Sequence, residues 1–260
     1  MLSFHTIRAY LKHWLLRVDH HSIHSPYFFD FYNRVLNGRS DESKFTRIED
    51  LRHSMLSDST MIEVEDLGSG AGSKPNRRSL SEITRTSSSP PDLAQFYVRI
   101  LSNMKARRII ELGSSVGITT LYLAQQREVE VITFEGSHGL ANVALTNFES
   151  MEQKNIHLIE GNITSTLPDF LQNPAKVNFV LMDANHEYEP TVRYFNFLLK
   201  RLDEDSIVVV DDIHRSTGME KAWDEIKAHP VVYGSADLFR CGILFFDPAL
   251  NHQHFVWSLN

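Results

Sequence analysis

From about Arg107 to Asp247, the chain alternates short apolar runs with segments whose apolar residues recur at helical spacing. Seven runs are typical of strands: Arg108–Gly113, Val129–Glu135, Asn155–Glu160, Val177–Asp183, Ser206–Asp212, Val231–Leu238 and Gly242–Asp247. Between the first six lie helical patterns over Ile118–Gln126, Gly139–Met151, Leu167–Gln172, Glu189–Leu202 and Gly218–Ala228. Alternation of this kind predicts a parallel sheet with helices on both faces.

The last two predicted strands differ from the others, because only Phe239, Arg240 and Cys241 separate them. Such a short connection cannot make a parallel crossover, so the last strand must run antiparallel to the strand before it. The pattern therefore predicts an α/β fold, a Rossmann-like seven-stranded sheet whose last strand is antiparallel.

The first hundred residues have a different pattern. Apolar residues from Leu2 to Val18 recur at helical spacing, and the segment Tyr27–Leu36 is a second, aromatic-rich helix candidate. Such stripes pack on a core or a partner chain, or they form the wall of a substrate pocket. We expect residues 1–105 to be an N-terminal helical extension, through which a homodimer would form, and residues 106–260 to be the cofactor-binding catalytic domain. Three clustered histidines (His20, His21 and His24) are more typical of solvated or capping positions than of a metal site.

Residues 66–91 form a polar segment rich in glycine, proline and serine. The stretch Asp66–Gly72 reads acid-x-Gly-x-Gly-x-Gly, but a charged segment precedes it and no apolar helical pattern follows. We expect segment 66–91 to be a flexible lid-like loop over the site rather than an idle linker or a second nucleotide site.

Composition narrows the class of protein. A net charge of −7 and a pI near 6.0 give no basic surface for nucleic acid. The single cysteine, Cys241, excludes a disulfide framework and suits a reducing compartment. No run approaches the roughly 20 apolar residues of a membrane span. Charged residues interrupt the N-terminal apolar segment, which therefore lacks the apolar core of a signal peptide. These features predict a cytoplasmic enzyme without nucleic-acid or membrane partners.

The most informative stretch runs from Arg108 to Ala124. A strand ends near Glu111, a turn carries Gly113 and Gly117, and a helix follows, which is where exposed backbone N–H groups meet a ligand. The next strand ends in Glu135, eighteen residues after Gly117. An acid about 20 residues on holds a ribose diol in nucleotide-binding units. The stretch predicts a nucleoside-cofactor site; the alternative is an ordinary turn without a ligand.

The glycine pattern indicates which nucleoside is bound. Dinucleotide sites favour Gly-x-Gly-x-x-Gly, whereas those positions here are Gly113, Ser115 and Ile118. The pattern acid-x-Gly-x-Gly-x-Gly fits with one substitution, at Ser115. This resembles motif I of the class I S-adenosylmethionine-dependent methyltransferases, and most of all their catechol O-methyltransferase-like branch. The resemblance covers roughly residues 95–250, and the terminal antiparallel hairpin is also typical of that family.

The resemblance implies a set of cofactor-binding residues. Glu111 would face the cationic amino-acid tail, Glu135 the ribose, and Asn162 the adenine, where the family more often has Asp. The complete expected set is Glu111, Gly113, Ser115, Gly117, Ile118, Thr119, Glu135, Gly136, Ser137, Asn162 and Asp183.

The resemblance also implies a metal site. In this family, an Asp after the fourth strand and an Asp-Asn pair after the fifth bind Mg²⁺, and Asp183, Asp211 and Asp212 match those positions, with Asp212 in place of Asn. Oxygen ligands with open positions suit Mg²⁺, Ca²⁺ or Mn²⁺. The alternative is that one acid orients the cofactor and another caps the following helix.

The family's general-base lysine corresponds to His186, which we expect to be catalytic together with Asp183. The alternatives are a solvated loop histidine at this position, His214 as the base, or either histidine as a metal ligand. The resemblance thus implies S-adenosylmethionine-dependent O-methylation of a small-molecule acceptor. Two rival hypotheses remain: an NAD(P)-linked Rossmann oxidoreductase, and a non-catalytic cofactor-binding protein that regulates or scaffolds a partner.

Overall fold

The computed structural model describes residues 4–65, 76–126 and 128–259. Its contacts divide the chain into two compact units: residues 39–170 form one, and the segments up to Gly38 and from Leu171 onward form the other. The predicted division near residue 105 does not coincide with these boundaries. No described helix is long and apolar enough to cross a membrane.

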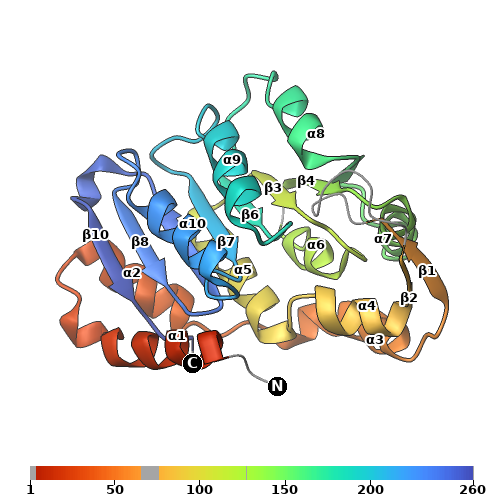
Figure 1. The fold of residues 1–260 in the computed structure, drawn as a ribbon, viewed down its shortest axis with the longest axis horizontal. Helices are drawn as coiled ribbons and strands as arrows, with labels where there is room; N and C mark the ends of the chain where they lie inside the picture. Colours follow the sequence, from red (N-terminus) through yellow and green to blue (C-terminus); the bar gives the residue numbers. More distant parts are fainter. Residues whose placement is uncertain (1–3, 66–75, 127, 260) are drawn as a thin grey trace. The chain divides into compact units, whose positions relative to one another are not determined.

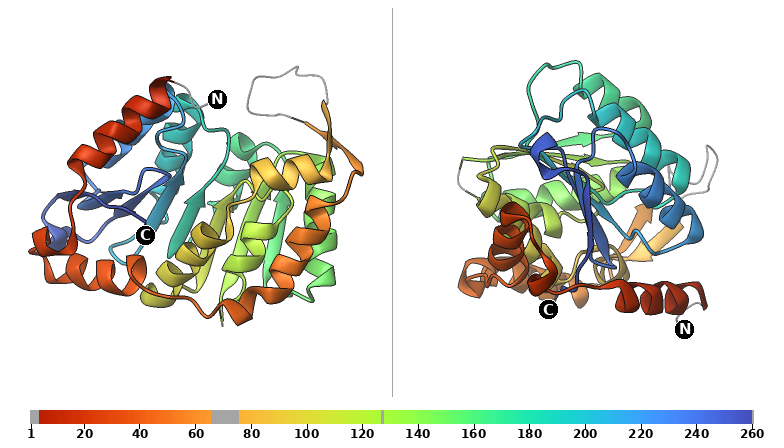
Figure 2. Two further views of the ribbon diagram at one scale, coloured as in Figure 1. Left: turned by 90° about the horizontal axis from the view of Figure 1, so that it is seen from below. Right: turned by 90° about the vertical axis from the view of Figure 1, so that its left-hand side faces the viewer.

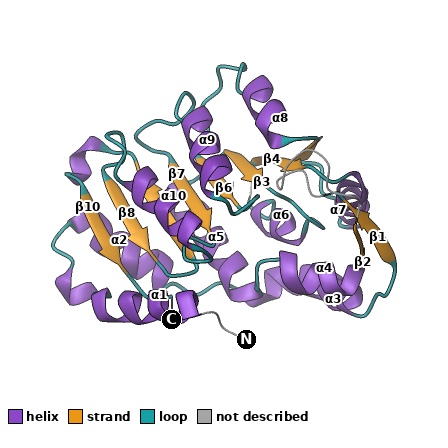
Figure 3. Ribbon diagram, in the orientation of Figure 1, coloured by secondary structure: helices purple, strands orange, loops and turns teal. Residues whose placement is uncertain are grey.

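The unit of residues 39–170 is built on three parallel strands: β3 (Arg108–Leu112), β4 (Glu130–Glu135) and β5 (Ile156–Glu160). Strand β4 pairs with β3 on one side and with β5 on the other. Its helices, shown in Figures 1 and 3, are α3 (Thr46–Leu56), α4 (Leu80–Ser87), α5 (Pro91–Met104), α6 (Ile118–Leu123), α7 (His138–Ser150) and α8 (Ile163–Phe170), preceded by a 3-10 turn at Glu42–Phe45. A hairpin of β1 (Met61–Val64) and β2 (Asn76–Ser79) completes the unit.

The second unit contains five strands in the order β10-β8-β9-β7-β6. They are β6 (Phe179–Met182), β7 (Ile207–Asp211), β8 (Gly234–Asp237), β9 (Cys241–Phe245) and β10 (Gln253–Val256). Strand β9 runs antiparallel to both of its neighbours, β7 and β8, while β6 and β7 are parallel. The predicted Rossmann-like α/β class and the antiparallel final hairpin are therefore confirmed.

Strand β10 has no counterpart among the seven predicted strands. It pairs in parallel with β8. Its sequence, Gln253-His-Phe-Val256, offers only a short half-polar run, so its strand conformation depends on the neighbouring edge rather than on a strong local pattern.

The helices of the second unit are α1 (Phe4–Leu16), α2 (Pro26–Phe31), α9 (Tyr188–Leu198) and α10 (Thr217–Lys227), with short helical turns at His20–Ser22, Tyr32–Leu36 and Pro248–Leu250. The predicted packing of the second aromatic segment is confirmed. Phe28 and Phe31 are buried, and both rings meet Phe245 edge-on, at 5.2 and 5.0 Å between ring centroids. This contact fastens α2 to β9.

Helix α1 differs from that expectation. Only Ala9 and His13 are buried in it, and its large apolar side chains are exposed. The periodicity correctly predicts an amphipathic helix. Of the surroundings expected for its apolar side, packing on the core of this chain is not observed, and packing on a partner chain stays a prediction.

The predicted loop 66–91 is only partly a loop. Residues 66–75 lie outside the described residues, whereas residues 76–79 form β2 and residues 80–87 form α4. The Ser79 side chain accepts a hydrogen bond from the Glu82 N–H, and Leu80 and Ile83 are buried. The Ser79 N-cap and the burial of the apolar face stabilise this short helix. The serine-rich composition of the segment obscures both features in the sequence.

Candidate functional site

Two groups of chemically active side chains lie at the carboxyl ends of strands, one in each unit. The cofactor group comprises Glu111, Glu135 and the turn 113–119, in the unit of residues 39–170. The acid–histidine group comprises Asp183, His186 and Asp212, in the other unit.

Glu111 is fully buried on β3. One of its carboxylate oxygens, Oε2, accepts hydrogen bonds from the hydroxyls of Thr120 and Thr133, both at 2.5 Å. The other, Oε1, is buried and has no hydrogen-bond partner among the described residues. A buried carboxylate oxygen without a partner is energetically costly, so this atom is poised to accept a donor from a ligand or a water molecule.

Burial dominates the electrostatics of Glu111. It raises the pKa of this carboxyl to about 7, although the hydroxyls of Thr120 and Thr133 pull in the opposite direction and the nearby Glu135 adds to the rise. At neutral pH the group is therefore close to half-ionised, and a cation beside it would favour the carboxylate form.

Glu135 ends β4 and binds the turn. Its Oε2 accepts the Ser115 N–H at 2.7 Å, and its Oε1 accepts the Ser137 N–H at 2.9 Å. Burial raises the pKa of Glu135, while the N–H groups of Ser137, Ser115 and Gly136 oppose that rise. The structure thus places Glu135, Ser115, Gly136 and Ser137 together, as the sequence predicts.

The backbone of the turn explains its glycines. Gly113 and Gly117 have φ angles of 94° and 84°, and Ser115 also adopts a left-handed φ of 48°. A Cβ on Gly117 would approach the Phe148 ring to 2.5 Å. Gly117 is therefore required for both conformation and space, and α6 begins directly after it, with Ile118 and Thr119 buried.

Buried serine hydroxyls surround this turn, and of these residues only Ser115 belongs to the set predicted from the sequence. The hydroxyls of Ser88, Ser89, Ser114 and Ser115 are buried without a hydrogen-bond partner among the described residues. The Ser89 N–H lies 3.4 Å from the Thr119 hydroxyl, which brings the linker between α4 and α5 to the start of α6. The serine-rich composition of segment 66–91 predicts a loop over the site but does not indicate which of its serines lie near the turn.

Asn162 occupies a capping position. Its side-chain oxygen accepts the Thr164 N–H at 2.9 Å at the start of α8, and the residue is exposed. The amide oxygen of Asn162 therefore already has a hydrogen-bond partner within the chain. The contact of Asn162 with the adenine stays a prediction.

The acid–histidine group follows β6 and β7, whose ends are aligned because Met182 pairs with Val210. The His186 Nε2 lies 3.4 Å from Asp183 Oδ1, and its Nδ1 lies 3.9 Å from Asp212 Oδ2. Asp212 also accepts a hydrogen bond from Arg215 at 3.1 Å. The structure therefore brings together three of the predicted residues, with the imidazole between two carboxylates.

The backbone of this group is strained. His186, Asn185 and Asp212 have φ angles of 42°, 63° and 54°, a region that non-glycine residues seldom adopt. Strain of this kind is often found at functional sites. Burial lowers the pKa of His186, the Asp212 carboxylate opposes this shift, and Arg215 reinforces it. The imidazole is consequently neutral at neutral pH and able to accept a proton.

The oxygen donors of Asp183, Asp211 and Asp212 are chemically suited to Mg²⁺. Among the described residues, however, no three His, Cys, Asp or Glu side chains are grouped so that they could hold a metal ion. The contacts of His186 with Asp183 and Asp212 do not test for an ion, and the metal site stays a prediction.

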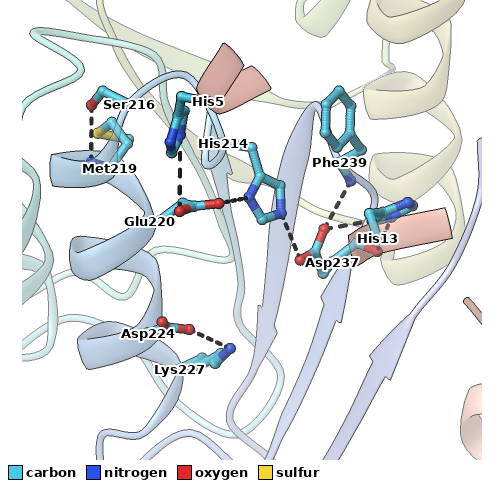
Figure 4. Close-up of polar contacts among 10 residues, drawn as sticks. All are labelled: His5, His13, His214, Ser216, Met219, Glu220, Asp224, Lys227, Asp237 and Phe239. Carbon is cyan, nitrogen blue, oxygen red and sulfur yellow. Dashed lines mark hydrogen bonds and ion pairs between the residues drawn. The ribbon is translucent and has the colours of Figure 1, made fainter. Parts of the chain in front are cut away.

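His214, the alternative base, is engaged elsewhere. Its Nδ1 lies 3.0 Å from Glu220 Oε1, and its Nε2 lies 2.8 Å from Asp237 Oδ2 (Figure 4). Burial alone would lower the pKa of His214, but Asp237 and Glu220 outweigh it and raise the pKa. Because the raised pKa favours the form that already carries the proton, and both ring nitrogens are at hydrogen-bond distance from a carboxylate, His214 is less suited than His186 to accept a proton.

Comparison with known proteins places the cofactor group in a recognised domain. Residues 110–213 match a family model described as a methyltransferase domain. Two curated relatives are catechol O-methyltransferases: that of Mycobacterium tuberculosis is 26% identical over 52% of this chain, and that of Niastella koreensis is 24% identical over 56%. The matched stretches span 60% and 65% of those relatives' own lengths, which is less than two thirds.

Solved structures give the same fold. An O-methyltransferase from Bacillus cereus in complex with SAH has a TM-score of 0.59 at 17% identity, covering 83% of this chain and 94% of that chain. An O-methyltransferase from Streptomyces achromogenes involved in tomaymycin synthesis, in complex with SAM, has a TM-score of 0.56 at 16% identity, covering 80% and 100%. At these identities the likeness concerns the fold alone.

Proposed function

We propose that this chain, a class I methyltransferase similar in sequence to the catechol O-methyltransferases, transfers a methyl group from S-adenosylmethionine to an oxygen of a small molecule. The observation that carries the proposal is the buried, unpartnered Oε1 of Glu111 beside a glycine turn at the start of a helix. A nucleoside ligand with a cationic tail would supply both the missing donor and the charge that this carboxylate needs.

On the cofactor side, Glu111 and Glu135 would bind S-adenosylmethionine and fix its orientation. Glu135 is already held by two backbone N–H groups, so its remaining lone pairs point in fixed directions and suit a pair of ribose hydroxyls. Glu111 would attract the ammonium of the amino-acid tail. Both acids are positioned before ligand arrives, which reduces the entropy lost on binding.

On the acceptor side, His186 would remove the hydroxyl proton as the acceptor oxygen is methylated. Its pKa is lowered by burial, so the neutral form is available at neutral pH. Asp183, at 3.4 Å, would orient the ring and stabilise the imidazolium that forms. Bound S-adenosylmethionine supplies an activated methyl group on sulfur, so most of the catalytic effect would come from alignment of the two reactants.

The role of Asp183, Asp211 and Asp212 as Mg²⁺ ligands can be tested separately. Turnover would be measured in excess EDTA and again after Mg²⁺ is restored, with cofactor affinity measured under both conditions. Lost and restored turnover at constant affinity would support the metal, whereas undiminished turnover would contradict it. The proposed removal of the proton by His186 does not require a metal ion.

The central experiment is calorimetric titration of the full chain with S-adenosylmethionine, S-adenosylhomocysteine and NAD. We expect micromolar binding of the first two and none of NAD. Glu111→Gln, which keeps the size but removes the charge, should weaken S-adenosylmethionine more than Glu160→Gln, an exposed acid at the end of β5. Binding of NAD instead would contradict the proposal.

Catalysis needs its own test, because a cofactor-binding protein without activity would pass the calorimetry. Formation of S-adenosylhomocysteine would be followed with a panel of small hydroxylated acceptors, beginning with vicinal aromatic diols because the curated relatives are named for catechol. Acceptor-dependent turnover would support the enzyme, and binding without turnover on any acceptor would favour the regulatory or scaffolding alternative.

A further inference from the structure

Helix α1 presents its apolar side away from the unit to which it is attached. Seven of its large apolar residues are exposed, with fractions from 46% for Ile7 to 84% for Phe4. Five of them follow one face at helical spacing and form what is here called the apolar stripe: Phe4, Ile7, Leu11, Trp14 and Leu15. Figures 1 and 2 show α1 at the edge of its own unit.

The opposite side of α1 is fastened by polar contacts, drawn in Figure 4. The His13 Nε2 lies 3.2 Å from the Asp237 backbone oxygen and 3.6 Å from its Oδ1, and the His5 Nε2 lies 3.9 Å from Glu220 Oε2. His214 links these two acids. A chain of histidines and carboxylates from α1, α10 and the β8–β9 hairpin therefore fixes which way the helix faces.

Aromatic contacts reinforce this orientation. The Phe239 ring, in the turn after β8, stacks on His214 at 5.4 Å and meets the rings of His13 and Tyr10 edge-on at 5.6 and 5.2 Å. Hydrophobic burial alone would favour the opposite orientation, because burying a large apolar side chain is worth about 1.5–3 kcal/mol. The observed arrangement therefore leaves the apolar stripe free for something outside this chain.

Charge indicates what that partner is. The exposed side chains of Arg8, Lys12 and Arg17 flank the stripe, and no acidic residue occurs between Phe4 and Val18. This basic segment belongs to a chain with a net charge of −7. A second copy docked stripe to stripe would bring like charges together, whereas an anionic lipid surface offers both an apolar interior and compensating charge.

Length indicates how the helix would meet a bilayer. Thirteen residues span about 20 Å, well short of the roughly 30 Å hydrocarbon core. Trp14 suits the boundary between headgroups and acyl chains, and the Arg17 guanidinium lies 5.7 Å from its ring. The geometry therefore suits a helix lying in the plane of the interface.

We propose that α1 docks this protein on the surface of an anionic lipid bilayer, with the apolar stripe among the acyl chains and Arg8 and Lys12 at the headgroups. The expectation of no membrane partner rested on the lack of a membrane span, and a helix lying on the surface escapes that criterion. This proposal is independent of the proposed methyl transfer.

The test is flotation of the full chain with vesicles of phosphatidylcholine alone or mixed with phosphatidylserine. We expect binding to the anionic vesicles and at least tenfold weaker binding to the neutral ones. Leu11→Asp should reduce binding at least tenfold, whereas the matched Leu145→Asp, at a 43% exposed leucine of α7, should leave it unchanged. The double variant Arg8→Gln with Lys12→Gln should remove the preference for anionic lipid.

Tryptophan fluorescence gives a second measurement. Trp14 is 49% exposed while Trp223 and Trp257 are buried, so a blue shift or quenching by brominated lipid would report on α1. No flotation with either vesicle, or equal binding of the two aspartate variants, would overturn the proposal. A lipid-free dimer that Leu11→Asp dissociates, together with no vesicle binding, would instead favour a second copy as the partner, as in the homodimer that the sequence predicts.

Discussion

The cofactor group and the acid–histidine group are both built on carboxylates, but they are held in different ways. In the cofactor group, backbone amides and threonine hydroxyls bind Glu111 and Glu135 at 2.5–2.9 Å, and both acids are buried. In the acid–histidine group the contacts of His186 are 3.4 and 3.9 Å, and Asp212 is 39% exposed. The acids of the cofactor group are thus held by short hydrogen bonds, whereas the contacts of His186 are longer. Under the proposed function, we expect these longer contacts to shorten when an acceptor binds.

The largest expected effect concerns the acid–histidine group and tests whether it acts in catalysis and not in cofactor binding. His186→Ala should lower kcat by roughly 10²–10⁴-fold, the usual scale for loss of a general base, and should leave the affinity for S-adenosylmethionine unchanged. The matched control is His157→Ala, whose side chain is 59% exposed in the other unit. Single-turnover rates and calorimetry separate the two effects. A rate within threefold of the parent protein would remove His186 from the mechanism.

The next effect concerns the cofactor group. Glu135→Ala should lose about 1.5–3 kcal/mol of S-adenosylmethionine binding, or about 10–150-fold in Kd, as for hydrogen bonds to a charged group. Glu130→Ala is the control at the other end of β4, where the side chain is 45% exposed and lies 3.6 Å from Arg108. Equal affinities in calorimetry for the two variants would contradict the ribose assignment.

The cofactor group is also the part of the site that the sequence predicts best. Glu111, Gly117 and Glu135 lie within 25 residues of one another and are positioned by a strand, a turn and a helix start that local patterns reveal. The Thr133 hydroxyl escaped prediction, although Thr133 is the direct partner of Glu111 in the pairing of β3 with β4. A side-chain contact of this kind depends on strand register, which the pattern of a single chain does not fix.

The orientation of α1 was beyond prediction for a related reason. Helical spacing identifies the apolar stripe but gives no information on whether the stripe faces this chain or something outside it. That choice depends on His5 and His13 reaching acids more than 200 residues away in sequence. Long-range pairs of polar side chains leave no periodic trace, which is why the sequence left open whether the stripe packs on a core or on a partner chain.

A pH dependence should sharpen the contrast between the two groups. Burial raises the pKa of Glu111 to about 7 from its ordinary 4.5, so a cationic ligand must bind the minor, ionised form below pH 7. The affinity for S-adenosylmethionine should fall roughly tenfold per pH unit below 7, and calorimetry at pH 6 and pH 8 measures this. In Glu111→Gln the profile should be flat. A flat profile in the parent protein would contradict the assignment.

The same shift has a consequence for stability. Because the folded pKa of Glu111 lies above the unfolded value, the folded state retains its proton as pH rises from 4.5 towards 7. The contribution of this group to the free energy of unfolding is therefore greatest below pH 4.5 and is lost across that window. Bound cofactor should offset the loss, so the difference in Tm with and without ligand should grow as the pH rises.

The smallest expected effect is on stability and concerns Asn162, whose place in the cofactor group it tests. Its amide oxygen accepts the Thr164 N–H at the start of α8, so Asn162→Ala should lower the free energy of unfolding by about 1 kcal/mol, as for loss of an N-cap. Asn162→Asp retains an acceptor and should be as stable as the parent protein in urea unfolding. Equal stability of the alanine variant would contradict the capping role. Calorimetry on the same two variants tests the adenine contact, because aspartate keeps both the cap and an acceptor for the adenine, whereas alanine keeps neither. If both variants bind S-adenosylmethionine like the parent protein, Asn162 serves the fold alone. If the alanine variant binds more weakly and the aspartate variant does not, the residue also contacts the adenine, as the sequence predicts.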